Sequence, residues 1–234
     1  MSFSIVQFQN AVASGTTTSL TATFTNNITA GNLIVVGYQM PSSGTTVTVS
    51  DGPGDTFTNT FSNVAWTDGT FGGSFAPNSA GGSKTVTLSY ASTSQTPTIV
   101  CAEISGVATS SPLDTSGSST GTSSSPGSGL YATSNANDII IGFDVGAKTL
   151  STTGGMTTIT SNTTSWNTYL MYEIETTTGS YGFIGGQASS GAWAAWMMAF
   201  KNPQSNSPIG RDITDLNNTL GANIMQAVNR ASTY

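Results

Sequence analysis

The sequence predicts an all-β protein: an antiparallel, jelly-roll-like β-sandwich with pseudo-repeated halves, followed by a C-terminal arm and a short amphipathic helix. Three observations support this prediction. Two short apolar runs, Gly31–Gln39 (GNLIVVGYQ) and Asn137–Asp144 (NDIIIGFD), nearly repeat each other. Short segments typical of strands recur with turn residues between them, a pattern typical of a sandwich or barrel. The elements that follow the first run return in the same order after the second.

The two apolar runs are expected to be matched central strands. When they are aligned on Asn32 and Asn137, Gly37 meets Gly142. Each run is rich in β-branched residues and does not alternate between polar and apolar positions. This pattern is typical of a strand that is buried on both faces. The rest of the chain is predicted to be arranged around these two strands.

In the first half, the predicted strands alternate with turns. The Asp51–Asp55 segment (DGPGD) has the residues of a tight reversal. The predicted strands are Ser4–Gln9, Thr17–Thr25, Gly31–Gln39, Thr45–Ser50, Thr56–Thr60, Val64–Thr67, Phe71–Ala76, Lys84–Tyr90 and Thr98–Ser105.

In the second half, the same order of elements is expected. Its predicted strands are Asn137–Asp144, Met156–Thr160, Thr168–Thr176, Tyr181–Gly185 and Gly191–Lys201. Residues 110–129 consist almost entirely of Ser, Thr, Gly and Pro, so they are interpreted either as a free linker or as an extended surface connection lying along the first half. The prediction is one sandwich over residues 1–201, with halves at about 1–109 and 130–201. Two small tandem sandwiches are the alternative.

The tail, residues 202–234, is predicted to be an extended arm followed by a helix. The arm contains two prolines, and the helix presents one apolar face. A lone amphipathic helix of this length is marginal in water, so it needs a surface, either on its own sandwich or on another subunit. The predicted docking residues are Ile213, Leu216, Leu220, Ile224 and Val228.

The composition excludes several classes of function. Only 7% of the residues are charged, the net charge is −6, and the chain has five Lys and Arg and no His. It therefore lacks the basic surface of a nucleic-acid-binding protein and the imidazole of a Ser-His-Asp triad. The single Cys101 lies in an apolar run and is expected to be buried and inert. No apolar run reaches the length of a membrane span, and the first residues do not resemble a signal peptide.

Few residues suggest chemistry. Glu173 and Glu175 share one face of a predicted strand, and Glu103 and Asp144 lie on others, but a solvated face is preferred to a glycosidase pair. The Asp51–Asp55 turn is preferred as a plain turn, and a calcium site there stays open. No catalytic residue, metal site or cofactor is predicted.

The tryptophans divide into two groups. Trp193 and Trp196 lie in an apolar strand and are expected in the core. Trp66 and Trp166 lie beside Thr, Ser and Asn in predicted loops. Because an exposed indole ring has a large apolar face, these two are the candidates for stacking against a glycan.

Several motifs together resemble a recurrent Ser/Thr/Gly-rich β-sandwich module of bacterial extracellular proteins and phage virion proteins of the decoration, cement or fibre type. They are GNLIVVGY, SDGPGDTFT, EISGV followed by SPLD, the Ser/Thr-Gly segment, NDIIIGF and the closing W-x-x-W-x-x-A-F-K. The resemblance covers about Ser4–Lys201 and implies display, adhesion or structural roles without catalytic residues. The start at Met1 without a signal and the terminal arm and helix favour the phage-like version.

The expected function is therefore that of a non-enzymatic virion structural protein, associated with a capsid as decoration or cement or with a tail or fibre. It is expected to be assembled in the host cytoplasm, to form a homo-oligomer, for which a trimer is the first hypothesis, and to dock on other virion proteins through its terminal segments. The alternative is a carbohydrate-binding or adhesion module of an extracellular protein, with surface glycans as partners. Neither hypothesis involves nucleic acid or a membrane.

Overall fold

The computed structural model describes residues 2–42 and 45–203. In this part of the chain every regular element is a β-strand, and every pair of strands is antiparallel. The predicted all-β, antiparallel class is confirmed. None of these residues forms a helix long and apolar enough to cross a membrane.

The first half of the chain forms two sheets. The larger has the strand order β1-β8-β3-β6-β5, and the smaller has the order β2-β7-β4. The strands are β1 (Ser4–Val12), β2 (Thr16–Thr23), β3 (Leu33–Met40), β4 (Val47–Asp51), β5 (Thr58–Trp66), β6 (Gly69–Ala76), β7 (Thr85–Gln95) and β8 (Thr98–Ser105). The first strand thus pairs with the eighth, and the third with the sixth, as in a jelly roll. Here the fifth strand joins the larger sheet.

The second half repeats this arrangement. Its five-stranded sheet has the order β13-β14-β11-β17-β9, which is the order of the first large sheet with each strand replaced by its counterpart. Two short ladders, β10-β15 and β12-β16, replace the small sheet, with β15 and β16 together in the position of β7. The strands are β9 (Leu113–Ser123), β10 (Tyr131–Ala132), β11 (Asp138–Gly146), β12 (Leu150–Thr152), β13 (Thr157–Asn162), β14 (Asn167–Glu175), β15 (Ser180–Tyr181), β16 (Gly186–Gln187) and β17 (Gly191–Lys201).

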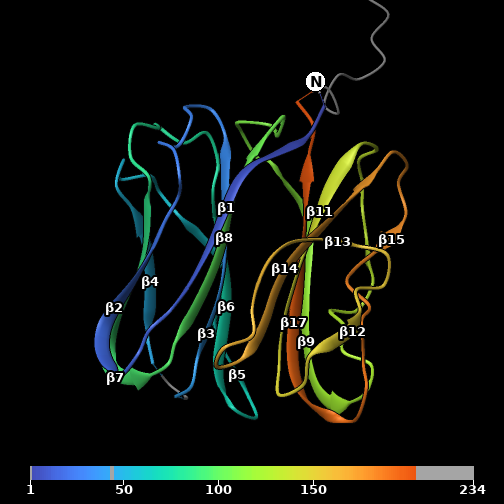
Figure 1. Cartoon of the computed structure of the whole chain (residues 1–234). Helices are drawn as coiled ribbons and strands as arrows, with labels where there is room; N and C mark the ends of the chain where they lie inside the picture. The colour runs from blue at the N-terminus through green and yellow to red at the C-terminus, as the bar shows by residue number, and fades with distance from the viewer. Residues whose placement is uncertain (1, 43–44, 204–234) are drawn as a thin grey trace, which may run out of the picture. The chain divides into compact units, whose positions relative to one another are not determined.

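No sheet of the described residues combines strands from the two halves. The described residues up to Pro203 nevertheless form one compact unit, within which each half has its own sheets. The two large sheets face each other, as Figure 1 shows with the first half on the left and the second half on the right. The predicted central strands correspond to β3 and β11, each of which is the middle strand of its sheet.

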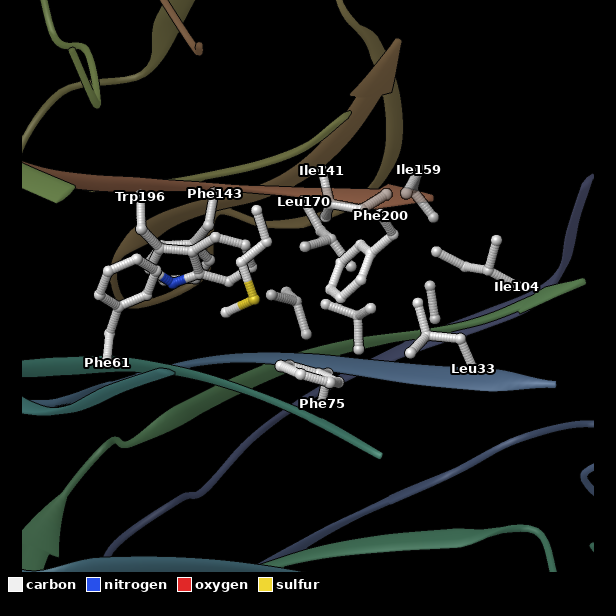
Figure 2. Close-up of a cluster of buried hydrophobic side chains, with 14 of the residues drawn as sticks. Leu33, Phe61, Phe75, Ile104, Ile141, Phe143, Ile159, Leu170, Trp196 and Phe200 are labelled. Carbon is white, nitrogen blue, oxygen red and sulfur yellow. The ribbon is translucent and has the colours of Figure 1, made fainter. Parts of the chain in front are cut away.

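The largest core cluster lies between the two large sheets and joins the halves (Figure 2). Trp196 of β17 stacks on Phe143 of its own half, with ring centroids 5.2 Å apart, and on Phe61 of the other half, at 6.0 Å. Its indole Nε1 donates a 3.0 Å hydrogen bond to the carbonyl oxygen of Gly72 in β6. Trp196 therefore contacts the first half through both its ring face and its polar edge.

Two glycines allow this close approach. A Cβ atom added to Gly37 of β3 would overlap the ring of Phe143, and one added to Gly73 of β6 would overlap Trp196. The aromatic rings of the second half therefore lie directly on the backbone of the first. Each half also has its own core under its small sheet, around Val36 and Leu88 in the first half and around Met171 and Phe183 in the second.

The alignment of the two central strands is wrong in one respect, the face on which each residue lies. Gly37 faces the other half, whereas a Cβ atom at Gly142 would meet Met156 and Phe183 in the outer core of the second half. A shift of one residue moves every side chain to the opposite face of a sheet. The repeat therefore identifies equivalent strands but not equivalent positions within them.

The interpretation of residues 110–129 as a joining segment is wrong for its central part. Leu113–Ser123 is β9, the edge strand of the second large sheet, and it pairs with β17 along nearly its whole length. Small residues are required there, because a Cβ atom at Gly117 would overlap the ring of Tyr131 and one at Gly121 would overlap Trp193. The low-complexity composition of this strand is thus explained by aromatic rings that lie across it.

Candidate functional site

A recess of about 410 Å³ is the candidate site, because it brings together the two tryptophans predicted for stacking. Trp66 and Trp166 come from different halves, and their rings meet edge to face with centroids 5.5 Å apart and planes at 73°. The predicted loop position is wrong for Trp66, which ends β5 and has only 8% of its surface exposed, whereas Trp166 lies between β13 and β14 and is half-buried. The recess is lined by Pro41, Trp66, Thr67, Asp68, Gly69 and Trp166.

The hairpin between β5 and β6 positions one wall of the recess. Trp66 ends β5, Gly69 begins β6, and Thr67 and Asp68 form the turn between them. Gly69 has φ of +138°, and a Cβ atom there would overlap the carbonyl oxygen of Met40. Only glycine at position 69 lets this turn lie against the end of β3. This turn places the carboxylate of the preceding residue, Asp68, at the rim of the recess.

The other wall comes from the corresponding hairpin of the second half. Trp166 immediately precedes β14, the counterpart of β6. The pseudo-repeat therefore places an indole at the same hairpin of each half, and the packing of the two large sheets brings the hairpins together. Sequence reasoning proposed both tryptophans separately but missed their contact and the contribution of Asp68.

The recess is polar and carries a negative charge. Its one ionisable side chain among the described residues is Asp68, and the hydroxyl group of Thr67 lies next to it on an exposed residue. The indole Nε1 of Trp66 is buried and has no hydrogen-bond partner in the described part of the chain. The recess thus combines an indole surface with a carboxylate acceptor and a hydroxyl group.

The carboxylates considered for glycosidase chemistry are distributed over the two halves. Glu103 in β8 is fully buried and accepts hydrogen bonds from Gln7 Nε2 at 2.6 Å, Asn32 Nδ2 at 2.5 Å and the Thr29 amide at 2.9 Å. These bonds tie the start of β3 and the loop before it to β8. Glu103 is thus a structural acceptor within the first half.

Glu173 and Glu175 lie on β14 in the second half, and the pKa of Glu173 is raised by burial and by its neighbour Glu175. Asp144 of β11 pairs with Tyr169, whereas Glu173 pairs with Ile140. Four residues along a strand separate these positions by about 13 Å. That spacing exceeds the separation of the carboxyl groups in either glycosidase geometry.

Asp144 is itself unusual. It is 1% exposed, and neither carboxyl oxygen has a hydrogen-bond partner among the described residues. Burial raises its pKa well above the ordinary value.

The Asp51–Asp55 segment has the hydrogen bonds of a turn. Asp51 Oδ1 accepts from the amides of Gly54 and Asp55, at 3.0 and 2.9 Å, and Asp55 Oδ1 accepts from the amide of Ala80 at 2.9 Å. Burial and the neighbouring Asp55 raise the pKa of Asp51. Within residues 2–42 and 45–203, no three or more His, Cys, Asp or Glu side chains are grouped so as to hold a metal ion.

The carboxyl groups of Asp114 and Asp138 influence each other, which the sequence did not predict. The carboxylate of Asp114 at the start of β9 accepts four hydrogen bonds from Ser134 and Asn135, and these bonds close the loop before β11. Burial raises the pKa of Asp114, but the bonds from Ser134 and Asn135 outweigh it and hold the pKa below its usual value. The pKa of Asp138 is raised to about 7 by burial and by Asp114, against the opposing charge of Lys201.

The remaining candidate residues are in the core or outside the described residues. Trp193 and Trp196 are buried, which confirms their prediction as core residues. Cys101 is fully buried as predicted, and burial raises the pKa of its thiol to about 12. The predicted docking residues Ile213, Leu216, Leu220, Ile224 and Val228 lie outside the described residues.

Comparisons with models of protein families, with curated proteins and with solved structures found no match to this chain.

Proposed function

We propose that this chain is a non-enzymatic virion structural protein, of the capsid decoration or cement kind or associated with a tail or fibre. In this proposal it is assembled in the host cytoplasm, forms a homo-oligomer and docks on other virion proteins through its terminal segments. The observation that carries the proposal is the state of β1, the N-terminal strand.

β1 is an open edge with apolar side chains. It pairs with β8 on one side, and its other side pairs with no strand of the described residues. Val6 is 46% exposed and Phe8 is 51% exposed, and the strand contains neither a charged residue nor a proline. Soluble proteins usually protect long edge strands with such residues. The register of β1 shifts between Ile5 and Gln7, and Asn10 hydrogen-bonds to Thr160 and Asn162 of β13, so the part of this edge suited to pairing with another chain is the uncharged segment around Val6 and Phe8.

The architecture is compatible with this role. Jelly rolls occur in viral capsid proteins and also in lectins and cupins, so the fold alone does not distinguish these functions. The low charge of the chain adds support, because a neutral surface rich in hydroxyl groups packs against copies of itself without strong repulsion. A carbohydrate-binding or adhesion role, with an extracellular location, is the second candidate function, and the recess at Trp66 and Trp166 favours it.

The test is the mass of the protein in solution, measured by light scattering. The full chain is expected to form an oligomer, with a trimer as the first hypothesis, and the double variant Val6→Lys/Phe8→Lys is expected to lower the mass. Ile184→Lys is the matched control, because Ile184 is 52% exposed and lies outside β1. A chain that ends at Lys201 tests the contribution of the C-terminal segment. A full chain that stays monomeric and does not bind viral shells or tails contradicts the proposal.

A further inference from the structure

We propose that the recess formed by Trp66, Trp166 and Asp68 is a binding site for a neutral pyranose sugar, as a unit of a larger glycan. The inference rests on the second candidate function and names its ligand, and it is independent of assembly, because sugar binding at the recess and assembly through β1 use different residues. The recess would provide attachment to a carbohydrate surface.

The aromatic component of the site is well defined. Trp166 is half-buried, and its ring meets the ring of the buried Trp66 in an edge-to-face contact. The two rings hold each other in place, so a ligand that stacks on Trp166 meets a preorganised surface, and the entropy lost on binding is small. A pyranose ring has an apolar face of C–H groups that matches an indole in size and polarity.

The polar component selects the class of ligand. Asp68 supplies a carboxylate that accepts hydrogen bonds from two vicinal hydroxyl groups, and Thr67 supplies a hydroxyl group. The described cations are Lys84, Lys148 and Lys201, and none of them lines the recess. With a net charge of −6, the protein repels uronic acids, phosphorylated ligands and nucleic acids.

An organic cation is the main competing ligand, because aromatic residues and a carboxylate also form ammonium cages. A cage surrounds the cation with separate aromatic walls. Here the ring centroids are only 5.5 Å apart and the rings contact each other, so no gap for an ammonium group remains between them. The contact leaves one indole surface next to a polar rim, which is the arrangement that a sugar ring requires.

The test uses the indole N–H signals of the four tryptophans in nitrogen–proton correlation NMR spectra of the full-length protein. The probes are maltotetraose and a tetramer of N-acetylglucosamine, with a galacturonic acid tetramer and choline for comparison. Either neutral oligosaccharide is expected to shift the signals of Trp66 and Trp166, with Kd of about 1 mM or lower. The signal of Trp193 is the internal control, because this residue is buried in the outer core of the second half, whereas Trp66 and Trp166 belong to the core between the large sheets.

Variants separate stacking from folding. Trp166→Ala is expected to weaken sugar binding at least ten-fold, and Asp68→Asn several-fold. Trp166→Phe keeps an aromatic packing partner for Trp66 and is expected to bind with intermediate affinity. An unchanged Trp193 signal shows that each variant is folded. Ile184→Ser, which removes an exposed apolar side chain outside both the recess and β1, is the matched control and is expected to bind as the unchanged protein does.

Three outcomes overturn the inference: no shift of the Trp66 and Trp166 signals with either neutral oligosaccharide at about 10 mM, binding of the galacturonic acid tetramer as tightly as the neutral probes, or binding of choline alone. Equal loss of binding in Ile184→Ser and Trp166→Ala also overturns it. Assembly is measured on the same samples by light scattering. A protein that assembles without binding sugar contradicts only this inference, and a monomer that binds sugar contradicts only the proposed function.

Discussion

At the scale of single residues, the contact between the halves depends on the absence of side chains. Gly37→Ala would place a Cβ atom inside the contact radius of the Phe143 ring. We expect this substitution to lower the free energy of unfolding by about 1–3 kcal/mol, the usual cost of overpacking a core. Urea denaturation followed by tryptophan fluorescence measures this change.

Gly146→Ala is the matched control for Gly37→Ala. It lies on β11, the counterpart of β3, and the nearest atoms to its added Cβ are at 3.4 Å, an ordinary contact. We expect its stability to be unchanged or slightly raised, because alanine restricts the unfolded chain. Adding Phe143→Leu to Gly37→Ala should recover part of the loss, since a smaller side chain leaves room for the methyl group. Equal effects of the two glycine substitutions would contradict the proposed close approach.

Asp138 gives a pH-dependent prediction. Its pKa is raised from 3.8 to about 7 in the folded protein, by burial and by the neighbouring Asp114. Between these two values the folded state holds a proton that the unfolded state has lost, so the free energy of unfolding contributed by Asp138 falls as pH rises from about 4 to 7. Below this window the contribution is fully present, and above it the contribution is lost.

Asp138→Asn isolates this effect from the other carboxyl groups. The amide cannot ionise, and it has nearly the same size and shape as the carboxyl group. We expect the stability of the unchanged protein relative to Asp138→Asn to fall with pH across this window, as measured by urea denaturation at a series of pH values. Carbon NMR of the Asp138 carboxyl group should show a midpoint near pH 7. A midpoint near pH 4, or parallel stability curves, would contradict the raised pKa of Asp138.

At the scale of elements, β9 shows where a composition rule is misleading. Its Ser, Thr and Gly residues match a linker, yet Gly117 and Gly121 lie beneath Tyr131 and Trp193. We expect Gly121→Val to weaken the pairing of β9 with β17, with faster amide hydrogen exchange in β9 than in the unchanged protein. Thr122→Val, on an exposed neighbour in the same strand, is the control and should leave exchange unchanged. Slow exchange in both variants would contradict the role of the glycine.

Much of the element order could be predicted from the sequence, because strands that are buried on both faces have continuous β-branched runs. This identified β3 and β11 as equivalent central strands. β9 was missed because its small residues are explained by aromatic rings from other segments, Tyr131 and Trp193, that lie across it. The pattern of one strand does not reveal which side chains from elsewhere in the chain will cover it. The sequence did not indicate that each half keeps its own sheets, since the same polar–apolar alternation arises whether a strand packs on its own half or on the other half.

The candidate site was predictable only in part, because it also depends on contacts between distant segments. The polar neighbours of Trp66 and Trp166 indicated each tryptophan individually as a candidate for stacking. Their contact depends on the packing of two large sheets that are separated along the chain, and the carboxylate of Asp68 reaches the rim only because Gly69 permits the turn. Long-range packing of this kind has no local signal in one sequence.

At the scale of the whole molecule, the shared core couples the two halves. Trp196 contacts Phe61 and hydrogen-bonds to Gly72 in the first half, while it stacks on Phe143 in the second. Each half also has its own smaller core, but its large sheet would expose an apolar face without the other half. The two halves are therefore expected to unfold in one cooperative transition, with coincident curves from circular dichroism and fluorescence.

Trp196→Ala tests this coupling directly. Removal of a fully buried tryptophan is expected to cost about 3–5 kcal/mol, because it leaves a large cavity between the sheets and a buried carbonyl group without its donor. If the halves are coupled, the slowest-exchanging amides of β3 and of β11 should lose the same protection, although Trp196 belongs to the second half. Protection that is lost in β11 but kept in β3 would show two independent sandwiches, and the contact between the large sheets would then contribute little to stability.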